Sequence, residues 1–286
     1  METILVTGAT GKLGSAVVEA LVDRGIFVKA ATRQTTKIKW TQRVQPLVFD
    51  YKDTGLYKAA LDKVSGVFLI APPLDSEAPS KMIPFIDKAG ESGVKYILFI
   101  SALKMELSEQ NPLRMIELHL LKSGIDCTIL RPNFFMENFS TGWLAPSIAS
   151  GAIRLSAGEA KTSFISVEDI ARAAAVCLEE KRSGQQYDLT GREALSYGEV
   201  VRILSDVCGR KVTYHTISET ETMRLAREQG MPESAIQYMA NLFAMVRKGL
   251  MAEITGTVRE LTGKAPMSFE EFAQKNADIW KVRKAA

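Results

Sequence analysis

Short apolar runs alternate with longer amphipathic stretches over the first half of the chain. The runs are rich in β-branched residues and lack alternating polar positions, which is typical of strands buried on both faces of a parallel sheet. Helical patterns separate them, at residues 12–24, 54–63, 79–92 and 113–123. This alternation predicts an α/β, Rossmann-type domain with a doubly wound parallel sheet. The expected strands are Ile4–Val6, Phe27–Thr32, Leu47–Phe49, Val67–Ala71, Tyr96–Ile100 and Cys127–Leu130.

The pattern changes after Arg131. Pro132 and the residues behind it interrupt the strand rhythm, and Ser166 has the character of a helix N-cap. One further strand is expected at Gln186–Leu189, followed by helices near 196–207, 218–229, 232–249 and 269–280. We therefore predict a sheet domain of residues 1–132 and 167–190. Residues 133–166 and 191–286 would form a smaller, mainly helical lobe.

Composition narrows the class of protein. The 286 residues are 46% hydrophobic and 24% charged, as in globular proteins, and 36 basic residues against 33 acidic ones leave a net charge of +3. This charge is too small to predict nucleic acid or an acidic membrane surface as the partner. No signal peptide or membrane span is expected, and three cysteines without paired spacing suggest buried thiols in a reducing compartment. We expect a cytoplasmic monomer or homodimer with a small-molecule substrate.

A glycine-rich segment, Thr7–Gly14, directly follows the first strand and opens the first helix. Its glycines permit a tight turn, close approach of the backbone to a pyrophosphate and close packing of helix on strand. The helix N-terminus offers N–H groups and partial positive charge to phosphates. The alternative is a glycine-rich connection without a ligand. The segment predicts a dinucleotide site that includes Gly8, Thr10, Gly11, Lys12 and Leu13.

The end of the second strand bears on the choice of nicotinamide cofactor. Enzymes selective for NAD place an acidic residue there, about 20 residues after the glycine turn, to bind the ribose hydroxyls. Here the strand ends at Arg33, with Lys37 and Lys39 beyond it, and the next acidic residue is Asp50. A guanidinium suits a 2′-phosphate, so we predict NADP(H). An ordinary solvated loop is the alternative interpretation.

The ligand of an open α/β sheet lies beyond the carboxyl ends of its strands. The residues predicted to line the cofactor there are Asp50 and Tyr51, Ala71, Pro72 and Pro73, Ser101, and Asn133 with Phe134. The aromatic stretch after the sixth strand would also meet the substrate, through Phe135, Met136 and Asn138. A hydrophobic plug between lobes is the alternative for this stretch.

Several segments together resemble one family. They are Thr7–Gly14, Arg33, Ser101–Ala102, Leu130–Phe139 and Phe164–Ala171. With them the chain resembles the NmrA-like atypical short-chain dehydrogenase/reductases over essentially its whole length. It is most similar to the clavine dehydrogenases, with azoreductases, triphenylmethane dye reductases and quinone oxidoreductases as more distant relatives. The resemblance implies an NAD(P)H-dependent oxidoreductase. Leu113 stands where many relatives carry a histidine.

The usual acid/base pair of short-chain dehydrogenases, Tyr-x-x-x-Lys, is missing. None of the seven tyrosines is followed four residues later by lysine, and no metal-ligand spacing is present. The two histidines, His119 and His215, lie in a helix and a short second-lobe strand and are not expected to be catalytic. The catalytic residues are therefore unknown, and Ser101 is a candidate positioning group only.

A site without this pair fits an electrophile that needs no protein acid. Hydride transfer to an iminium or a dye cation gives a neutral product, so positioning matters more than protonation. Together with this charge argument, the resemblance implies an NADPH-dependent reductase that transfers hydride to a flat iminium, quinone, azo or dye substrate. The alternative is a regulator that senses NADP(H) without turnover. A sugar-nucleotide epimerase is disfavoured, because that branch keeps its tyrosine and lysine.

Overall fold

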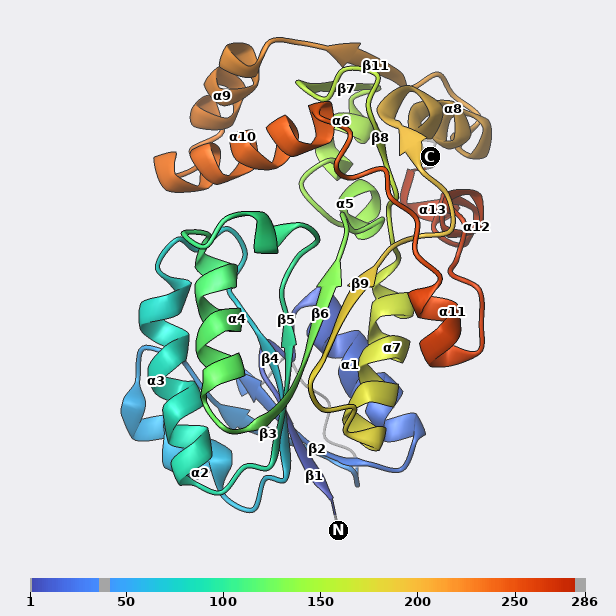
Figure 1. Ribbon diagram of the computed structural model, residues 1–286. Coiled ribbons are helices and arrows are strands. Elements are labelled where there is room, and N and C mark those ends of the chain that lie inside the picture. The colour runs from blue at the N-terminus through green and yellow to red at the C-terminus, as the bar shows by residue number, and fades with distance from the viewer. Residues whose placement is uncertain (1, 36–41, 281–286) are drawn as a thin grey trace. The chain divides into compact units, whose positions relative to one another are not determined.

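The computed structural model describes residues 2–35 and 42–280, which fold into two compact units (Figure 1). Unit 1 comprises Met1–Pro132, Val167–Leu189 and Thr257–Gly263. Unit 2 comprises Asn133–Ser166, Thr190–Gly256 and Lys264–Ala286. The sequence pattern assigns Thr257–Gly263 to the smaller lobe. The structure gives it to unit 1, because α11 (Thr257–Thr262) packs against α7 (Val167–Glu180).

A parallel sheet forms the centre of unit 1. Its seven described strands follow the order β3-β2-β1-β4-β5-β6-β9, and every neighbouring pair is parallel. The chain runs outward from β1 on one side and then starts again at β4 on the other side. This reversal is the switch point of a Rossmann fold and confirms the predicted fold class. The strands are β1 (Thr3–Val6), β2 (Phe27–Thr32), β3 (Val44–Val48), β4 (Gly66–Ile70), β5 (Tyr96–Ile100), β6 (Asp126–Pro132) and β9 (Gln185–Leu189).

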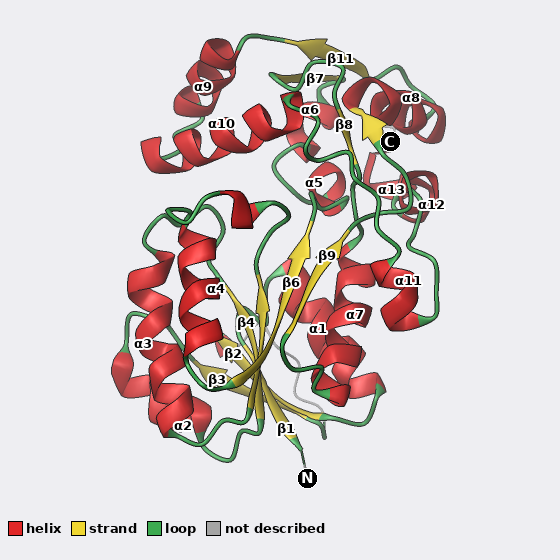
Figure 2. Cartoon of the chain, in the orientation of Figure 1, coloured by secondary structure: helices red, strands yellow, loops and turns green. Residues whose placement is uncertain are grey.

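Helices cover both faces of this sheet (Figure 2). Helices α1 (Lys12–Asp23), α7 and α11 lie on one face, and α2 (Tyr57–Leu61), α3 (Ala78–Glu91) and α4 (Pro112–Lys122) lie on the other. Because both faces are covered, all five residues of β5 are buried. Short 3-10 turns, η2 (Thr54–Leu56) and η3 (Met105–Leu107), precede α2 and α4.

Two strands differ from the predicted ones at proline positions. Strand β3 spans Val44–Val48 rather than Leu47–Phe49, and it includes Pro46. A proline is tolerated there because β3 lies at the edge of the sheet. Strand β6 continues to Pro132, whose carbonyl accepts a hydrogen bond from the Leu103 N–H at 3.1 Å. A proline lacks the backbone N–H donor but keeps its carbonyl acceptor, so the strand can continue past residue 130.

Unit 2 is mainly helical, with four short strands in two small sheets. Strand β7 (Ala152–Leu155) pairs with β11 (Thr213–Thr216), and β8 (Lys161–Thr162) pairs with β10 (Leu195–Ser196). Strand β11 confirms the short second-lobe strand expected around His215, whereas β7, β8 and β10 carry too little periodicity to be predicted from sequence. Cys127 and Cys177 of unit 1 are buried as expected, but Cys208 of unit 2 is partly exposed, so the expectation of a buried thiol is wrong there. The helices are α5 (Glu137–Ser140), α6 (Ala145–Ala149), α8 (Tyr197–Cys208), α9 (Glu219–Glu228), α10 (Glu233–Arg247), α12 (Phe269–Lys275) and α13 (Ala277–Trp280).

An aromatic core holds the separate segments of unit 2 together. The Phe139 ring packs edge to face on Phe164 and on Phe269, each at 5.1 Å between centroids. The indole N–H of Trp280 donates to the Phe139 carbonyl at 3.0 Å. Edge-to-face pairs fix ring orientation as well as burying apolar area. Residues from three distant parts of the chain thus share one core.

The packing of α1 on β1 depends on a glycine without room for a side chain. A Cβ built on Gly14 would lie 2.1 Å from the Gly8 carbonyl oxygen, whereas one on Gly198 in α8 would lie 3.6 Å from its nearest neighbour. We expect Gly14→Ala to lower the free energy of unfolding by about 2 kcal/mol or more. Gly198→Ala, the matched control, should be neutral or slightly stabilising. Urea unfolding with equal losses for both variants would contradict this packing argument.

Candidate functional site

The turn between β1 and α1 has a backbone shape that requires glycine. Gly8 has a φ of +61°, and a Cβ there would lie 2.9 Å from a methyl carbon of Ile70. The Gly11 N–H donates to the Gly8 carbonyl at 2.8 Å, and Gly11 is the N-cap of α1. Gly8, Thr10, Gly11 and Lys12 are exposed, whereas Leu13 is buried in the helix packing. The turn is therefore an open backbone cradle.

The same end of α1 is electropositive. The first N–H groups of an α-helix have no partner within the helix, and Gly11 has no side chain with which to cap them. The first turn contains no acidic residue that would offset the helix dipole. The open cradle and this helix end, at the switch point of the sheet, fit the pyrophosphate of a dinucleotide.

Hydrogen bonds place the end of β2 beside this turn. The Ala9 N–H donates to the Ala31 carbonyl at 3.1 Å, and the hydroxyl oxygens of Thr10 and Thr32 are 3.3 Å apart. Arg33 follows Thr32 directly and is exposed. Its guanidinium is thus attached next to the predicted pyrophosphate site, where the 2′-phosphate of NADP would be expected. Lys37 and Lys39 lie outside the described residues.

The residues after β3 form a packed turn. The Asp50 carboxylate accepts a hydrogen bond from the Lys52 N–H at 2.9 Å. The Tyr51 ring packs on Phe49, and its hydroxyl donates to the Ile70 carbonyl at 3.1 Å. Burial raises the pKa of Tyr51, so this phenol stays protonated. Tyr51 therefore links the ends of β3 and β4, and the contact of Asp50 and Tyr51 with a cofactor stays a prediction.

The loop after β4 is held in an unusual conformation. Ala71 and Pro72 are half-buried and Pro73 is exposed, and the next residue, Leu74, has a left-handed φ of +54°. A bulky side chain in this region costs of order 1 kcal/mol or more and persists only where its surroundings enforce it. Lys81 binds the Asp75 carboxylate at 2.7 Å and fixes the far end of the loop. The lining role of Ala71, Pro72 and Pro73 stays a prediction.

The aromatic stretch after β6 belongs to unit 2, and its amide is fully used there. The Asn133 Nδ2 donates to the Ser163 hydroxyl at 2.8 Å and to the Met251 carbonyl at 2.9 Å. Its Oδ1 accepts the Phe134 N–H at 2.9 Å. Asn133 thus connects Ser163 and Met251 within unit 2. Its contact with a cofactor stays a prediction. Met136 is only 1% exposed, whereas Phe134, Phe135 and Asn138 are partly exposed.

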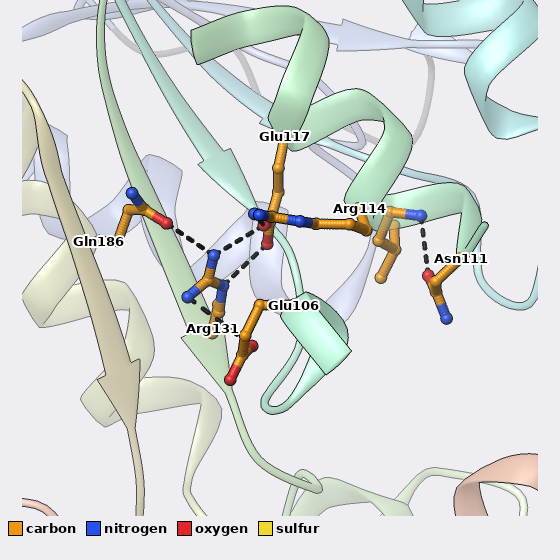
Figure 3. Close-up of polar contacts among 7 residues, drawn as sticks. Glu106, Asn111, Arg114, Glu117, Arg131 and Gln186 are labelled. Carbon is orange, nitrogen blue, oxygen red and sulfur yellow. Dashed lines mark hydrogen bonds and ion pairs between the residues drawn. The ribbon is translucent and has the colours of Figure 1, made fainter. Parts of the chain in front are cut away.

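A buried charge cluster joins the carboxyl end of β6 to α4 and to the start of β9, and the sequence analysis missed it. The Glu117 side chain is fully buried and binds Arg131 through two hydrogen bonds of 2.9 and 2.7 Å. Arg114 reaches the same carboxylate at 2.7 Å, and Gln186 accepts from Arg131 at 2.7 Å. Figure 3 shows Glu117 and Arg131 pointing toward each other, with Glu106 3.7 Å from Arg131.

The cluster fixes the protonation state of its central carboxyl. Burial alone would raise the pKa of Glu117, but the hydrogen bonds from Arg131 and Arg114 outweigh it and lower the pKa. The Ser101 hydroxyl is buried and has no hydrogen-bond partner among the described residues. An ionised Glu117 is a poor proton donor at neutral pH. A charged residue inside a buried strand, Arg131, was the sequence signal that could have revealed the cluster.

Among the described residues, no group of three or more histidine, cysteine, aspartate or glutamate side chains could hold a metal ion. None of the described helices has both the length and the apolar character needed to cross a membrane.

The family is decided by the match of the chain to known proteins. The model of the NmrA-like family matches residues 1–273. This chain belongs to the NmrA-like family. The glycine turn, Arg33, the buried cluster and the aromatic stretch all lie inside the matched range. The resemblance expected from sequence is thereby confirmed.

Several known proteins match over nearly the full length of both chains. Prestalk A differentiation protein A of Dictyostelium discoideum is 32% identical, covering 96% of this chain and 92% of that one. Agroclavine dehydrogenase of Claviceps fusiformis is 32% identical, covering 98% and 99%. NAD(P)H azoreductase of Xenophilus azovorans is 31% identical, covering 96% and 98%.

Solved structures show the same NmrA-like fold. NADPH-dependent quinone oxidoreductase of Escherichia coli, in complex with NADPH, has a TM-score of 0.83 at 25% identity, covering 96% of this chain and 99% of that one. Triphenylmethane reductase of Citrobacter, in complex with NADP(H), has a TM-score of 0.82 at 25% identity, covering 97% and 100%. The negative transcriptional regulator Nmra has a TM-score of 0.75 at 16% identity, covering 97% and 96%, and shares the fold alone.

Removing the charge of Glu117 tests the buried cluster. Glu117→Gln leaves Arg131 buried without its main counter-charge, and we expect a loss of about 3 kcal/mol in the free energy of unfolding. Glu221→Gln serves as the control. It breaks an exposed ion pair with Arg224 on α9, and the free energy of unfolding should change little. Urea unfolding at pH 7 measures both.

The pH dependence of this loss checks the sign of the pKa shift. A carboxyl whose pKa is lowered on folding stabilises the folded state above its ordinary pKa, here 4.5. That contribution disappears as the pH falls through the lowered value. The difference in the free energy of unfolding between the wild type and Glu117→Gln should stay constant from pH 7 to about 4.5 and become smaller below that pH. A difference in unfolding free energy that disappears between pH 7 and pH 5 would show that Glu117 is not held ionised.

Proposed function

We propose that this protein is an NADPH-dependent reductase that transfers hydride to a flat electrophile of the iminium, quinone, azo or dye type. The observation that carries the proposal is the open glycine turn at the switch point of the sheet, with Arg33 attached beside it. The relatives support it, because one is named an NAD(P)H azoreductase and another an NADPH-dependent quinone oxidoreductase.

The residues of unit 1 would hold the cofactor by its phosphates. The backbone of Gly8–Leu13 and the N-terminus of α1 would bind the pyrophosphate, and Arg33 the 2′-phosphate. Bound NADPH supplies a hydride, which carries two electrons to an electrophilic carbon or nitrogen and leaves NADP⁺. Phe134 and Phe135 of unit 2, which are partly exposed, are proposed to contact the substrate, whereas the predicted contact of Met136 does not fit its burial.

The described strand ends favour a substrate that needs no protein acid. Glu117 is ionised, and the Tyr51 hydroxyl is bonded to a backbone carbonyl with a raised pKa. An iminium that accepts hydride becomes a neutral amine, so its charge balance is complete without a proton. A quinone would become a hydroquinone anion, which water can protonate after the transfer. Ser101 would then orient the substrate or cofactor rather than donate a proton.

Turnover separates this proposal from a regulator that senses NADP(H). NADPH oxidation at 340 nm is followed with menadione, methyl red, malachite green and N-methyl-3,4-dihydroisoquinolinium, and NADPH binding is measured in parallel by calorimetry. Oxidation with at least one class of acceptor supports a reductase. Tight NADPH binding with no oxidation of any acceptor would favour the sensor.

Arg33→Ala tests the choice of cofactor. A charge-assisted contact to phosphate contributes about 1.5–3 kcal/mol, so NADPH affinity should fall roughly ten- to a hundredfold. NADH affinity should change little, because NADH lacks that phosphate. Arg202→Ala removes another exposed arginine, from α8, and is the matched control. Calorimetry that finds equal losses for NADPH and NADH would show that Arg33 does not bind the 2′-phosphate.

The pH–rate profile tests direct hydride transfer. With the iminium as substrate, kcat should vary only weakly from about pH 6 to 8.5, because no protein acid must titrate. Ser101→Ala should then cost less than Phe135→Ala, which loses apolar contact with the substrate. Circular dichroism confirms that both variants fold. A steep profile, or a loss above about a thousandfold in Ser101→Ala, would indicate proton transfer by the protein.

A further inference from the structure

Two threonine hydroxyls meet where the glycine turn lies against the end of β2. Thr10 belongs to the turn and is exposed, whereas Thr32 is the last residue of β2 and is only 5% exposed. Their hydroxyl oxygens are 3.3 Å apart, which is within reach of a hydrogen bond. Both residues belong to unit 1. The contact therefore joins the predicted pyrophosphate site directly to the strand end that carries Arg33.

The Thr32 hydroxyl also holds the backbone that follows it. The Gln34 N–H donates to the Thr32 Oγ1 at 3.2 Å, which closes a side-chain turn around Arg33. In addition, the Phe49 N–H donates to the Thr32 carbonyl at 2.9 Å and ties the strand end to the residue after β3. Arg33 lies beyond the last residue pair of the two strands, Thr32 with Val48. The Thr32 hydroxyl thus fixes a stretch of backbone that the sheet itself does not hold.

We infer that Thr32 is a positioning residue for the choice of NADPH over NADH, an inference that rests on the proposed function and its cofactor site. Binding a phosphate costs the entropy of ordering the arginine side chain and the backbone that carries it. Because the Thr32 hydroxyl orders that backbone beforehand, beside the glycine turn, the remaining cost of binding a 2′-phosphate is lower. NADH has no such phosphate, so its binding gains nothing from this hydroxyl. Thr32 acts through Arg33 and needs no contact with the cofactor.

Removing one hydroxyl tests the positioning role. Thr32→Val keeps the shape and the stiff β-branched side chain of threonine. We expect NADPH affinity to fall about three- to tenfold, as for one lost hydrogen bond, and NADH affinity to change less than about twofold. Thr32→Ser retains the hydroxyl and should restore most of the NADPH affinity. Calorimetry with each cofactor, in the absence of any acceptor, measures the dissociation constants.

Two further variants separate positioning from a merely structural role. Thr128→Val, the matched control, removes a buried hydroxyl of β6 that accepts a hydrogen bond from the Tyr96 hydroxyl at 2.7 Å. It should lower stability in urea without changing the ratio of NADPH to NADH affinity. In an Arg33→Ala background, Thr32→Val should cause little further loss of NADPH affinity, because its effect passes through Arg33.

The outcomes separate this inference from the function on which it rests. An unchanged ratio of NADPH to NADH affinity in Thr32→Val, or an equally large further loss in the Arg33→Ala background, would overturn the positioning role and leave the reductase intact. A wild type that binds NADPH no more tightly than NADH would overturn both the positioning role and the assignment of Arg33 to the 2′-phosphate. NADPH binding that depends on Thr32, in a protein that oxidises NADPH with none of the acceptors, would support the positioning role and refute the reductase.

Discussion

The close approach of α1 to the β1 turn governs the geometry of the candidate cofactor site. Because Gly14 has no side chain, the first turn of α1 can lie against the Gly8 carbonyl, where a Cβ would come within 2.1 Å. This contact sets the direction in which the helix leaves the sheet. It therefore also sets where the electropositive helix end points, at the place where the strand order reverses. Binding chemistry at this site follows from a backbone contact rather than from reactive side chains.

The charge cluster around Glu117 shows a different constraint at the same edge of the sheet. Ends of buried strands must carry backbone polar groups and functional side chains without exposing the core. Here α4 contributes the Glu117 carboxylate and β6 the Arg131 guanidinium, and the guanidinium donates two hydrogen bonds to the carboxylate. Such a pair contributes little net stability over an apolar alternative, but losing either partner is costly. Its value lies in holding the ends of β5 and β6 and the Ser101 loop in one arrangement.

Much of unit 1 could be predicted because its signals are local. Buried parallel strands give unbroken apolar runs, and the glycine turn has a steric cause that the sequence displays directly. Contacts between distant residues could not be predicted in this way. The sequence cannot show that the Asn133 amide donates to Ser163 and Met251, because both lie far along the chain.

The interleaved order of the two units affects how the protein can be made. Strand β9 and helix α11 complete unit 1 only after long stretches of unit 2 have been synthesised, and the end of the chain returns to the core of unit 2 through Trp280. Neither unit is a continuous stretch of sequence, and contacts of such long sequence separation slow folding. Cutting the chain at a single point will therefore not yield either unit alone.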